Sequence, residues 1–335
     1  MMQRWRTVER GLVVTLAVVL VGAVAGCQTT SDSATGGAGD QAALAHAQIV
    51  GHRGAAGLRP ENTLPAIRAG LAAGADAVEV DVQLSADGVP VVYHDLQLKP
   101  ALTRGPDGDW LDARGPPISS LTVAELQRYD VGRLKPGSDY ADRYPDQKPV
   151  EGTRIPTLRQ VLRAVKATDG AEIWIELKTD PTKPASSDPR ALAEATLDAL
   201  DRAGLSDRAK LLSFDWRGLA ATEGSGVPRV FLTAAFDNFD TLQGGAPGAS
   251  PWLSGIDIDD YDSVPAAVAA AGGEWWAPYY RQLGGRQGVA AARATGLSVG
   301  VWTVDDRGAA LRLVRDGVDA VITDRPDRMA AHAGS

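Results

Sequence analysis

The chain has 335 residues, enough for one large α/β domain or for two smaller domains. Hydrophobic residues make up 44% of it and charged residues 23%, which is typical of a globular protein and excludes a wholly disordered chain, a collagen-like repeat and a polytopic membrane protein. The net charge is −8 and no run of Lys or Arg occurs, so nucleic acids and anionic lipid surfaces are poor partners. The single cysteine excludes an intramolecular disulfide and a cysteine-based zinc cluster.

Residues 1–27 have the pattern of a secretory signal peptide. Three arginines in the first ten residues precede an uncharged apolar run, 11–25, which is short for a membrane span. The run ends at Val24-Ala25-Gly26-Cys27, which resembles a bacterial lipobox. That resemblance implies that Cys27 is the lipidated first residue of a mature protein anchored to the outer face of the cell membrane. An ordinary signal peptide that contains a cysteine is the alternative.

The remaining chain divides into a tether, a body and a tail. Residues 28–46 are rich in small and polar side chains and are expected to form a flexible tether. Residues 47–330 carry the periodic apolar patterns of a folded body, and residues 331–335 form a short tail. No second domain boundary and no internal repeat is visible in the body.

Short apolar runs alternate with helical patterns along the body, which is typical of parallel βα units. We therefore predict a TIM-type (β/α)8 barrel; an open doubly wound sheet is the alternative, weakened because no G-x-G-x-x-G follows the first strand. The predicted strands are 48–52, 77–83, 89–93, 172–177, 210–214, 229–233, 275–278, 298–303 and 319–323, with 255–258 as a weaker candidate. The predicted helices are 64–73, 123–129, 158–167, 189–203, 264–271, 286–294 and 307–315.

Two features interrupt the alternation. Asp87-Gly88 predicts a hairpin that folds residues 89–93 back onto 77–83, so one surplus strand need not be part of the barrel. Residues 96–156 then form a long insertion, rich in Pro and Gly, with one short helix. Insertions of this size in a compact domain are usually functional.

Two carboxylates lie on one face of the second predicted strand, Val78-Glu79-Val80-Asp81-Val82. Because side chains alternate along a strand, Glu79 and Asp81 point into the barrel while the valines face the helices. Like charges at this spacing are costly to bury without a cation. A metal site is therefore favoured over a solvent-facing strand.

Other charged residues are expected at the same rim, where the carboxyl ends of parallel strands meet. The first strand ends at His52-Arg53, and Glu176 and Lys178 share one face of the strand that begins at Glu172. The predicted hairpin sets residue 81 opposite residue 93, which brings His94 to the same level.

Each of these residue types has a use in phosphoryl chemistry. Three carboxylates, Glu79, Asp81 and Glu176, suit a hard divalent ion such as Ca²⁺, Mg²⁺ or Mn²⁺. Arg53 and Lys178 can neutralise a phosphate. The two histidines, His52 and His94, can serve as general acid and base.

In order along the chain, these residues resemble the glycerophosphodiester phosphodiesterase family. The matching motifs are His52-Arg53-Gly54, Pro60-Glu61-Asn62-Thr63, Glu79-Val80-Asp81-Val82, Asp87-Gly88, His94-Asp95, Glu176-Leu177-Lys178, Trp302-Thr303-Val304 and Thr323-Asp324-Arg325-Pro326.

The resemblance spans about 49–328 and implies a TIM-type barrel that hydrolyses glycerophosphodiesters to glycerol 3-phosphate and an alcohol. It implies a divalent metal, Ca²⁺ or Mg²⁺, on Glu79, Asp81 and Glu176. The acid/base pair would be His52 and His94, without saying which is the acid, and Arg53 and Lys178 would bind the phosphate. The chain departs from the family in one place: Asp305 stands where Asn is usual.

Roles are also expected for four further residues of these motifs. Asn62 or Thr63 is expected to cap the helix that begins at Leu64, and Glu61 to orient Arg53. Trp302 ends a strand at the rim and is the aromatic residue expected to contact substrate, with a choline-like cation as one candidate ligand.

Two alternative functions stay open. A phospholipase or a cell-wall polymer phosphodiesterase could use the same site, with the insertion changing access to it. A solute-binding lipoprotein without catalysis is disfavoured, because binding alone does not require two histidines beside three carboxylates. The expected partner in the favoured function is a small-molecule glycerophosphodiester substrate, and no protein partner is inferred.

Overall fold

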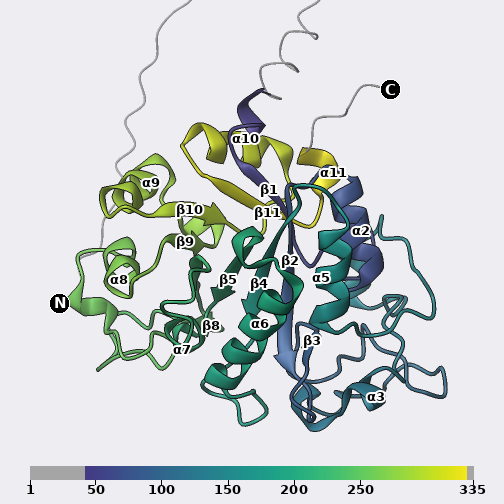
Figure 1. The fold of residues 1–335 in the computed structure, drawn as a ribbon. Helices are drawn as coiled ribbons and strands as arrows, with labels where there is room; N and C mark the ends of the chain where they lie inside the picture. The colour runs from purple at the N-terminus through teal and green to yellow at the C-terminus, as the bar shows by residue number, and fades with distance from the viewer. Residues whose placement is uncertain (1–41, 330–335) are drawn as a thin grey trace, which may run out of the picture.

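Eight parallel strands close into a barrel in the computed structural model, which describes residues 42–329. β1 pairs with β11 on one side and with β2 on the other, which closes the sheet (Figure 1). The predicted TIM-type (β/α)8 barrel is confirmed. Its strands are β1 Gln48–Gly51, β2 Ala77–Leu84, β4 Glu172–Leu177, β5 Ala209–Ser213, β6 Arg229–Thr233, β9 Trp275–Pro278, β10 Ser298–Val301 and β11 Ala320–Thr323.

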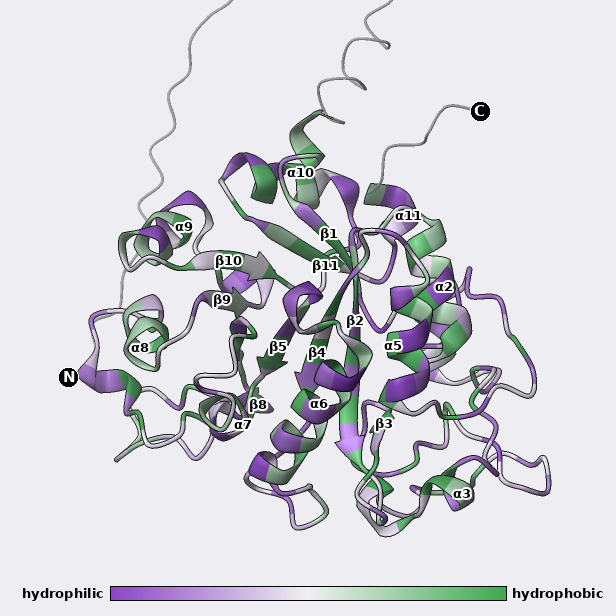
Figure 2. Cartoon of the chain, in the orientation of Figure 1, coloured by the Kyte–Doolittle hydropathy of each residue, from purple (hydrophilic) through white to green (hydrophobic). Residues whose placement is uncertain are grey.

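Helices follow the strands and cover the outside of the barrel. Most begin at a side-chain cap, such as Thr157 before α5 and Asp188 before α6, which satisfies free N–H groups of the first turn. In Figure 2, α6 carries hydrophobic residues on one side and hydrophilic residues on the other, while the barrel strands are mainly hydrophobic. The helices are α2 Leu64–Ala72, α5 Leu158–Lys166, α6 Pro189–Ala203, α7 Trp216–Ala220, α8 Val264–Ala270, α9 Gly285–Ala294, α10 Arg307–Arg315 and α11 Pro326–Met329.

The alternation along β2 is as predicted. Val78, Val80 and Val82 are fully buried and belong to the main hydrophobic core, which contains apolar side chains of α5 and α6. Glu79 and Asp81 are also buried, on the other face of the strand. The barrel therefore has an apolar outer layer and a charged inner rim.

The predicted hairpin is present and accounts for the ninth predicted strand, 89–93, which an eight-stranded barrel does not need. β3, Pro90–Val92, pairs antiparallel with β2 in the register that sets Val82 opposite Val92. This register places residue 93 opposite residue 81, and Tyr93 N donates to Asp81 O at 2.9 Å. β3 is an extension of the barrel sheet and not a ninth barrel strand.

The weaker strand candidate at 255–258 is wrong. Its last residue begins a 3-10 turn, Ile258–Asp260, which Asp257 caps through its side chain. A small hairpin after β6, formed by β7 Ala235–Phe236 and β8 Phe239–Asp240, was not predicted from the sequence. Strands of two residues are too short to show an alternating pattern.

The insertion has a small core of its own, separate from that of the barrel. Leu98, Ile118, Leu126 and Ile155 are buried in this cluster together with Val91 and Tyr93 at the end of the hairpin. Its helical turns are η1 Ile118–Ser120, α3 Val123–Leu126 and α4 Asp139–Asp142. In Figure 1 its loops surround α3 next to β3.

The signal peptide and the lipobox Cys27 predicted at 1–27, and the tail at 331–335, lie outside the described residues. Leu44 is already buried in the core, so packing begins before Ala47 and within the predicted tether. Within 42–329, no helix has the length and apolar character required to cross a membrane.

Candidate active site

Three carboxylates meet inside the barrel at the carboxyl ends of β2 and β4. Glu79, Asp81 and Glu176 each offer an oxygen, and these oxygens all lie within 4.8 Å of one another. The register of the two strands sets Asp81 directly beside Glu176, and all three side chains are buried. Burial and the negative charge of Asp81 raise the pKa of Glu79 to about 8.

Two of these oxygens have no hydrogen-bond donor. Glu79 Oε1 and Asp81 Oδ1 are both buried and accept no hydrogen bond within the described residues, although the charge of Lys178 Nζ lies 3.3 Å from Asp81 Oδ1. Buried polar atoms normally have hydrogen-bond partners, so a bound cation or a donor from a ligand would satisfy these oxygens. Close oxygen ligands of this number and charge fit a hard divalent ion, which confirms that the predicted triad can hold one.

Lys178 directly follows the last residue of β4 and lies next to the three carboxylates. Its Nζ is 2.6 Å from Glu176 Oε1 and 3.3 Å from Asp81 Oδ1. Burial raises the pKa of Asp81, but the surrounding positive charges, that of Lys178 first and that of Arg53 among the others, together lower that pKa. Lys178 therefore offsets part of the negative charge of the triad and helps to keep Asp81 ionised.

His52 follows β1 and is fixed by a residue from the opposite end of the sequence. Its Nδ1 is 2.7 Å from Asp324 Oδ1, and its Nε2 is 4.0 Å from Glu79 Oε2. Burial alone lowers the pKa of His52, but the Asp324 carboxylate raises it to about 9. Because Asp324 engages Nδ1, Nε2 is the ring nitrogen available to a ligand.

His94 follows β3 and has a different environment. Its Nδ1 is 3.4 Å from Asp95 Oδ2, and it lies near Arg53 and Lys178. Burial and these two cations lower the pKa of His94 to about 4. The hairpin thus delivers His94 to the charged rim as predicted, and the surroundings of the two histidines shift their pKa values in opposite directions.

Arg53 is held on several sides. Its backbone adopts a left-handed conformation, with φ 50°, and its N–H donates to Glu79 Oε2 at 2.8 Å. Its guanidinium contacts Glu61 at 2.7 Å and Asp81 at 3.3 Å, and donates to Tyr140 Oη at 3.1 Å. Glu61 thus contacts the Arg53 guanidinium, in agreement with the expectation that it orients Arg53.

Asn62 does more than the sequence suggested. Thr63 is the N-cap of α2. Asn62 instead forms two hydrogen bonds with Asp81, one through its amide nitrogen and one through its amide oxygen. Asn62 Nδ2 donates to Asp81 Oδ2 at 2.7 Å, and Asp81 N donates to Asn62 Oδ1 at 3.1 Å. Asn62 therefore fixes the orientation of one carboxylate of the triad.

The insertion contributes side chains to the site that were not predicted from the sequence. Tyr140, on α4, donates a short hydrogen bond to Glu61 and accepts one from Arg53. Tyr144 lies next to Asp324, whose charge adds to burial in raising the pKa of the Tyr144 hydroxyl. A local sequence pattern cannot predict these contacts, because Glu61 is about 80 residues from Tyr140 and Asp324 is about 180 residues from Tyr144 along the chain.

Asp324 and Asp305 form a second support that the motifs alone did not reveal. Asp305 Oδ1 accepts from Asp324 N at 2.8 Å and from Thr323 Oγ1 at 3.0 Å. These contacts hold the turn that presents Asp324 to His52. An Asn side chain could supply the same acceptor oxygen, so the departure at Asp305 keeps this contact.

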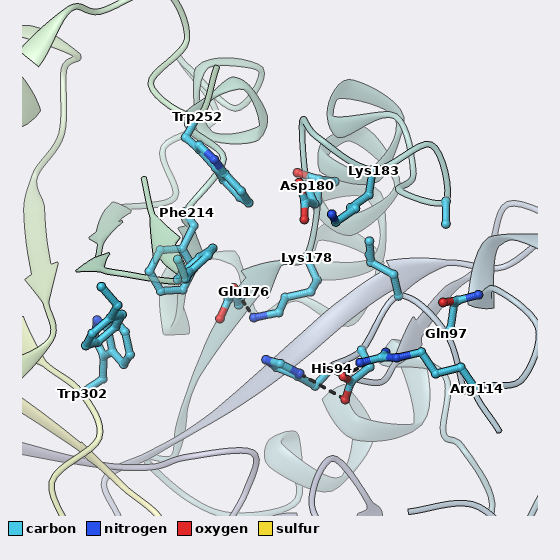
Figure 3. Close-up of a pocket in the computed structure, with 16 residues that line it drawn as sticks. His94, Gln97, Arg114, Glu176, Lys178, Asp180, Lys183, Phe214, Trp252 and Trp302 are labelled. Atoms are coloured by element: carbon cyan, nitrogen blue, oxygen red, sulfur yellow. Dashed lines mark hydrogen bonds and ion pairs between the residues drawn. The ribbon is translucent and has the colours of Figure 1, made fainter. Parts of the chain in front are cut away.

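The site opens through two connected cavities. The inner cavity, of about 110 Å³, is lined by both histidines, Arg53, Glu79, Glu176 and Lys178. The outer cavity, of about 690 Å³, shares His94, Glu176, Lys178, Phe214 and Trp302 with it and extends over further aromatic rings (Figure 3). Trp302 thus lies at the junction, where the sequence placed it.

Known proteins that are similar to this chain include enzymes named for the activity that the site residues suggest. Residues 52–328 match the Glycerophosphoryl diester phosphodiesterase family. A glycerophosphodiester phosphodiesterase of Caldanaerobacter subterraneus is 25% identical over 84% of this chain and 95% of its own length.

Solved structures give the same result. The crystal structure of a Silicibacter pomeroyi protein, provisionally named a glycerophosphoryl diester phosphodiesterase, is 35% identical, with a TM-score of 0.73 over 84% of this chain and 91% of that one. A glycerophosphodiester phosphodiesterase of Thermotoga maritima is 26% identical, with a TM-score of 0.55 over 84% of this chain and 96% of that one. The chain therefore belongs to the glycerophosphoryl diester phosphodiesterase family and is an enzyme of the phosphoric diester hydrolase class.

Proposed function

We propose that this enzyme hydrolyses glycerophosphodiesters to glycerol 3-phosphate and an alcohol, with a divalent metal ion and two histidines. The observation that carries the proposal is the convergence of carboxylates, cations and histidines around one inner cavity of about 110 Å³. That volume suits a phosphate group and an ion, and the outer cavity leaves room for an arm of the diester.

Glu79, Asp81 and Glu176 would hold the metal. Glu79 Oε1 and Asp81 Oδ1 are buried and accept no hydrogen bond, which supports this assignment, since a bound cation would satisfy both oxygens. A divalent ion bound there acts as a Lewis acid on the phosphoryl oxygens and offsets their charge.

Arg53 and Lys178 would bind the phosphate oxygens. Arg53 Nε is buried without a hydrogen-bond acceptor, although it is 3.3 Å from an Asp81 oxygen, so a donor remains for a ligand. Contacts with Glu61 and Tyr140 hold the guanidinium plane in place, which reduces the reorganisation needed when the phosphate binds.

The two histidines would carry the protons. In hydrolysis, a water oxygen forms a bond to phosphorus, its proton passes to a base, and the P–O bond to the alcohol breaks as an acid protonates the leaving oxygen. His52 and His94 both line the inner cavity and come from different strands. This arrangement supports their assignment as one acid and one base.

Removal of divalent ions tests the metal assignment. We expect chelation to abolish release of glycerol 3-phosphate from glycerophosphocholine and Ca²⁺, Mg²⁺ or Mn²⁺ to restore it. Glu176→Gln should reduce turnover by about 100-fold or more, because one charged ligand is lost. Glu172→Gln is the matched control, since Glu172 begins the same strand and pairs with Lys210. Full activity after exhaustive chelation would show that the assignment is wrong.

Single histidine variants test the acid/base pair. His52→Ala and His94→Ala should each lose about 10²-fold or more in turnover of an alkyl diester. A nitrophenyl diester has a leaving group that needs almost no proton, so the variant that lacks the acid should recover most of its rate on it. His46→Ala, at an exposed position, is the control. Near-normal alkyl rates in both test variants would contradict the assignment.

Tyr140→Phe tests whether the insertion positions Arg53. The substitution keeps the ring and removes the hydroxyl that joins Glu61 and Arg53. We expect about tenfold lower kcat/KM and weaker inhibition by inorganic phosphate, because a hydrogen bond to a charged group contributes about 1.5 kcal/mol. Tyr129→Phe in the same insertion is the control. A loss of thermal stability with unchanged phosphate inhibition would indicate a structural role alone.

A larger phosphodiester, from a phospholipid or a cell-wall polymer, is the second candidate substrate. The volume of the outer cavity, about 690 Å³, favours it over diesters with two small arms.

We also propose that the enzyme is anchored outside the cytoplasmic membrane through lipidated Cys27. The proposal rests on the motif Val24-Ala25-Gly26-Cys27 and on the polar segment that follows it. Two or more acyl chains at this residue would give stable attachment, where one chain is marginal. Mass spectrometry of the mature N-terminus would identify the modification, and an unmodified N-terminus in membrane-free protein would refute it.

A further inference from the structure

The outer cavity has two unlike sides (Figure 3). One side carries polar and charged residues, among them Gln97, Arg114 and Lys183. The other is a continuous aromatic wall, formed by Phe214, Phe236, Phe239, Trp252 and Trp302. Because the inner cavity holds the charged groups that suit a phosphate, the wall must face whichever arm of the diester extends outward.

The rings of the aromatic wall pack against one another edge to face. Phe214 lies 5.3 Å from Trp302 and 5.2 Å from Phe239, and Phe239 lies 5.4 Å from Trp252, between ring centroids. The β7–β8 hairpin supplies Phe236 and Phe239, so the wall is built by an addition to the barrel and not by the barrel strands alone.

The aromatic wall offers few polar groups to a ligand. The three phenylalanine rings have none, and the Trp302 indole N–H donates to Ala277 O at 2.9 Å. A polyol arm bound against it would lose water without gaining hydrogen bonds there, which is unfavourable. The wall is therefore poorly suited to the hydroxyl groups of a sugar or inositol.

A quaternary ammonium arm is also disfavoured. Cations bind aromatic faces within about 6 Å of the ring centroid, and Lys178 Nζ already lies 5.7 Å from that of Phe214. Two carboxylates that line the cavity already contact a lysine: Glu176 contacts Lys178, and Asp95 contacts Lys99 at 3.4 Å. The third, Asp180, accepts hydrogen bonds from Thr182 and lies beside Lys183 on the polar side of the cavity (Figure 3). A second cation at the aromatic wall would therefore meet the charge of Lys178, with the carboxylate of Asp180 across the cavity from it.

We propose that the outer cavity selects diesters with an uncharged, apolar arm, such as an alkyl, acyl or aryl group. This inference rests on the proposed function, because it assigns the inner cavity to the phosphate. The hydrocarbon could belong to the alcohol or to an acyl group on the glycerol. Each buried methylene contributes about a fourfold factor in binding, so a partly buried six-carbon chain should raise kcat/KM at least tenfold.

The test compares soluble diesters with one phosphate and different arms. Glycerophosphohexanol and hexanoyl-glycerophosphocholine carry the hydrocarbon on the alcohol or on the glycerol, while glycerophosphocholine and glycerophosphoinositol lack it. We expect at least one hydrocarbon substrate to exceed both others about tenfold or more in kcat/KM, and the better of the two identifies the arm. Equal values across the panel, or a preference for inositol or choline, would overturn the proposal.

Variants of the β7–β8 hairpin test whether the aromatic wall causes the preference for a hydrocarbon arm. Phe236→Ala and Phe239→Leu should each lower the ratio of kcat/KM between the preferred hydrocarbon substrate and glycerophosphoinositol by about tenfold and threefold, respectively. Tyr280→Ala is the matched control, because Tyr280 packs on Tyr279 but does not line the cavity. An unchanged ratio in both test variants would contradict the role of the wall.

Calorimetry with monoesters separates this inference from the proposed function. Hexyl phosphate should bind at least tenfold more tightly than phosphocholine or inositol phosphate. If no diester is hydrolysed but hexyl phosphate is preferred, the proposed function fails and the cavity assignment stands. If diesters are hydrolysed and hexyl phosphate has no advantage, only the cavity assignment fails.

Discussion

Mutual repulsion of three buried carboxylates is the constraint around which the site is organised. Glu79, Asp81 and Glu176 lie together in a barrel whose interior cannot solvate them, and burial raises the pKa of two of them. Two cations at the same rim, Lys178 and Arg53, form ion pairs with Asp81 and offset part of this repulsion. Glu79 Oε1 and Asp81 Oδ1 still accept no hydrogen bond, which leaves a place for a further positive charge.

The parts of the fold that meet this constraint come from distant segments. β2 and β4 supply the carboxylates, the β3 hairpin brings His94, and the turn after β11 supplies Asp324 to His52. The insertion adds Tyr140, which joins Glu61 to Arg53. These contacts make the insertion part of the site, although it has a hydrophobic core of its own.

Features that depend on a local sequence pattern, such as alternation along a strand or a turn motif, could be predicted from the sequence. Alternation along β2 assigned Glu79 and Asp81 to the interior, and Asp87-Gly88 gave the hairpin register that the structure confirms. The sequence did not predict the pairing of Asp324 with His52 or the reach of Tyr140, since these contacts depend on closure of the barrel. The β7–β8 hairpin was missed because its strands have two residues each.

Direct titration of the metal-free full-length enzyme with Ca²⁺, Mg²⁺ and Mn²⁺ in a calorimeter tests the central claim. The account predicts saturable binding of one divalent ion per chain and its loss in Asp81→Asn, because Asp81 supplies one of the three charged oxygens that lie within 4.8 Å of one another. Absence of binding at millimolar concentrations, or one ion bound with equal affinity in Asp81→Asn, would contradict it.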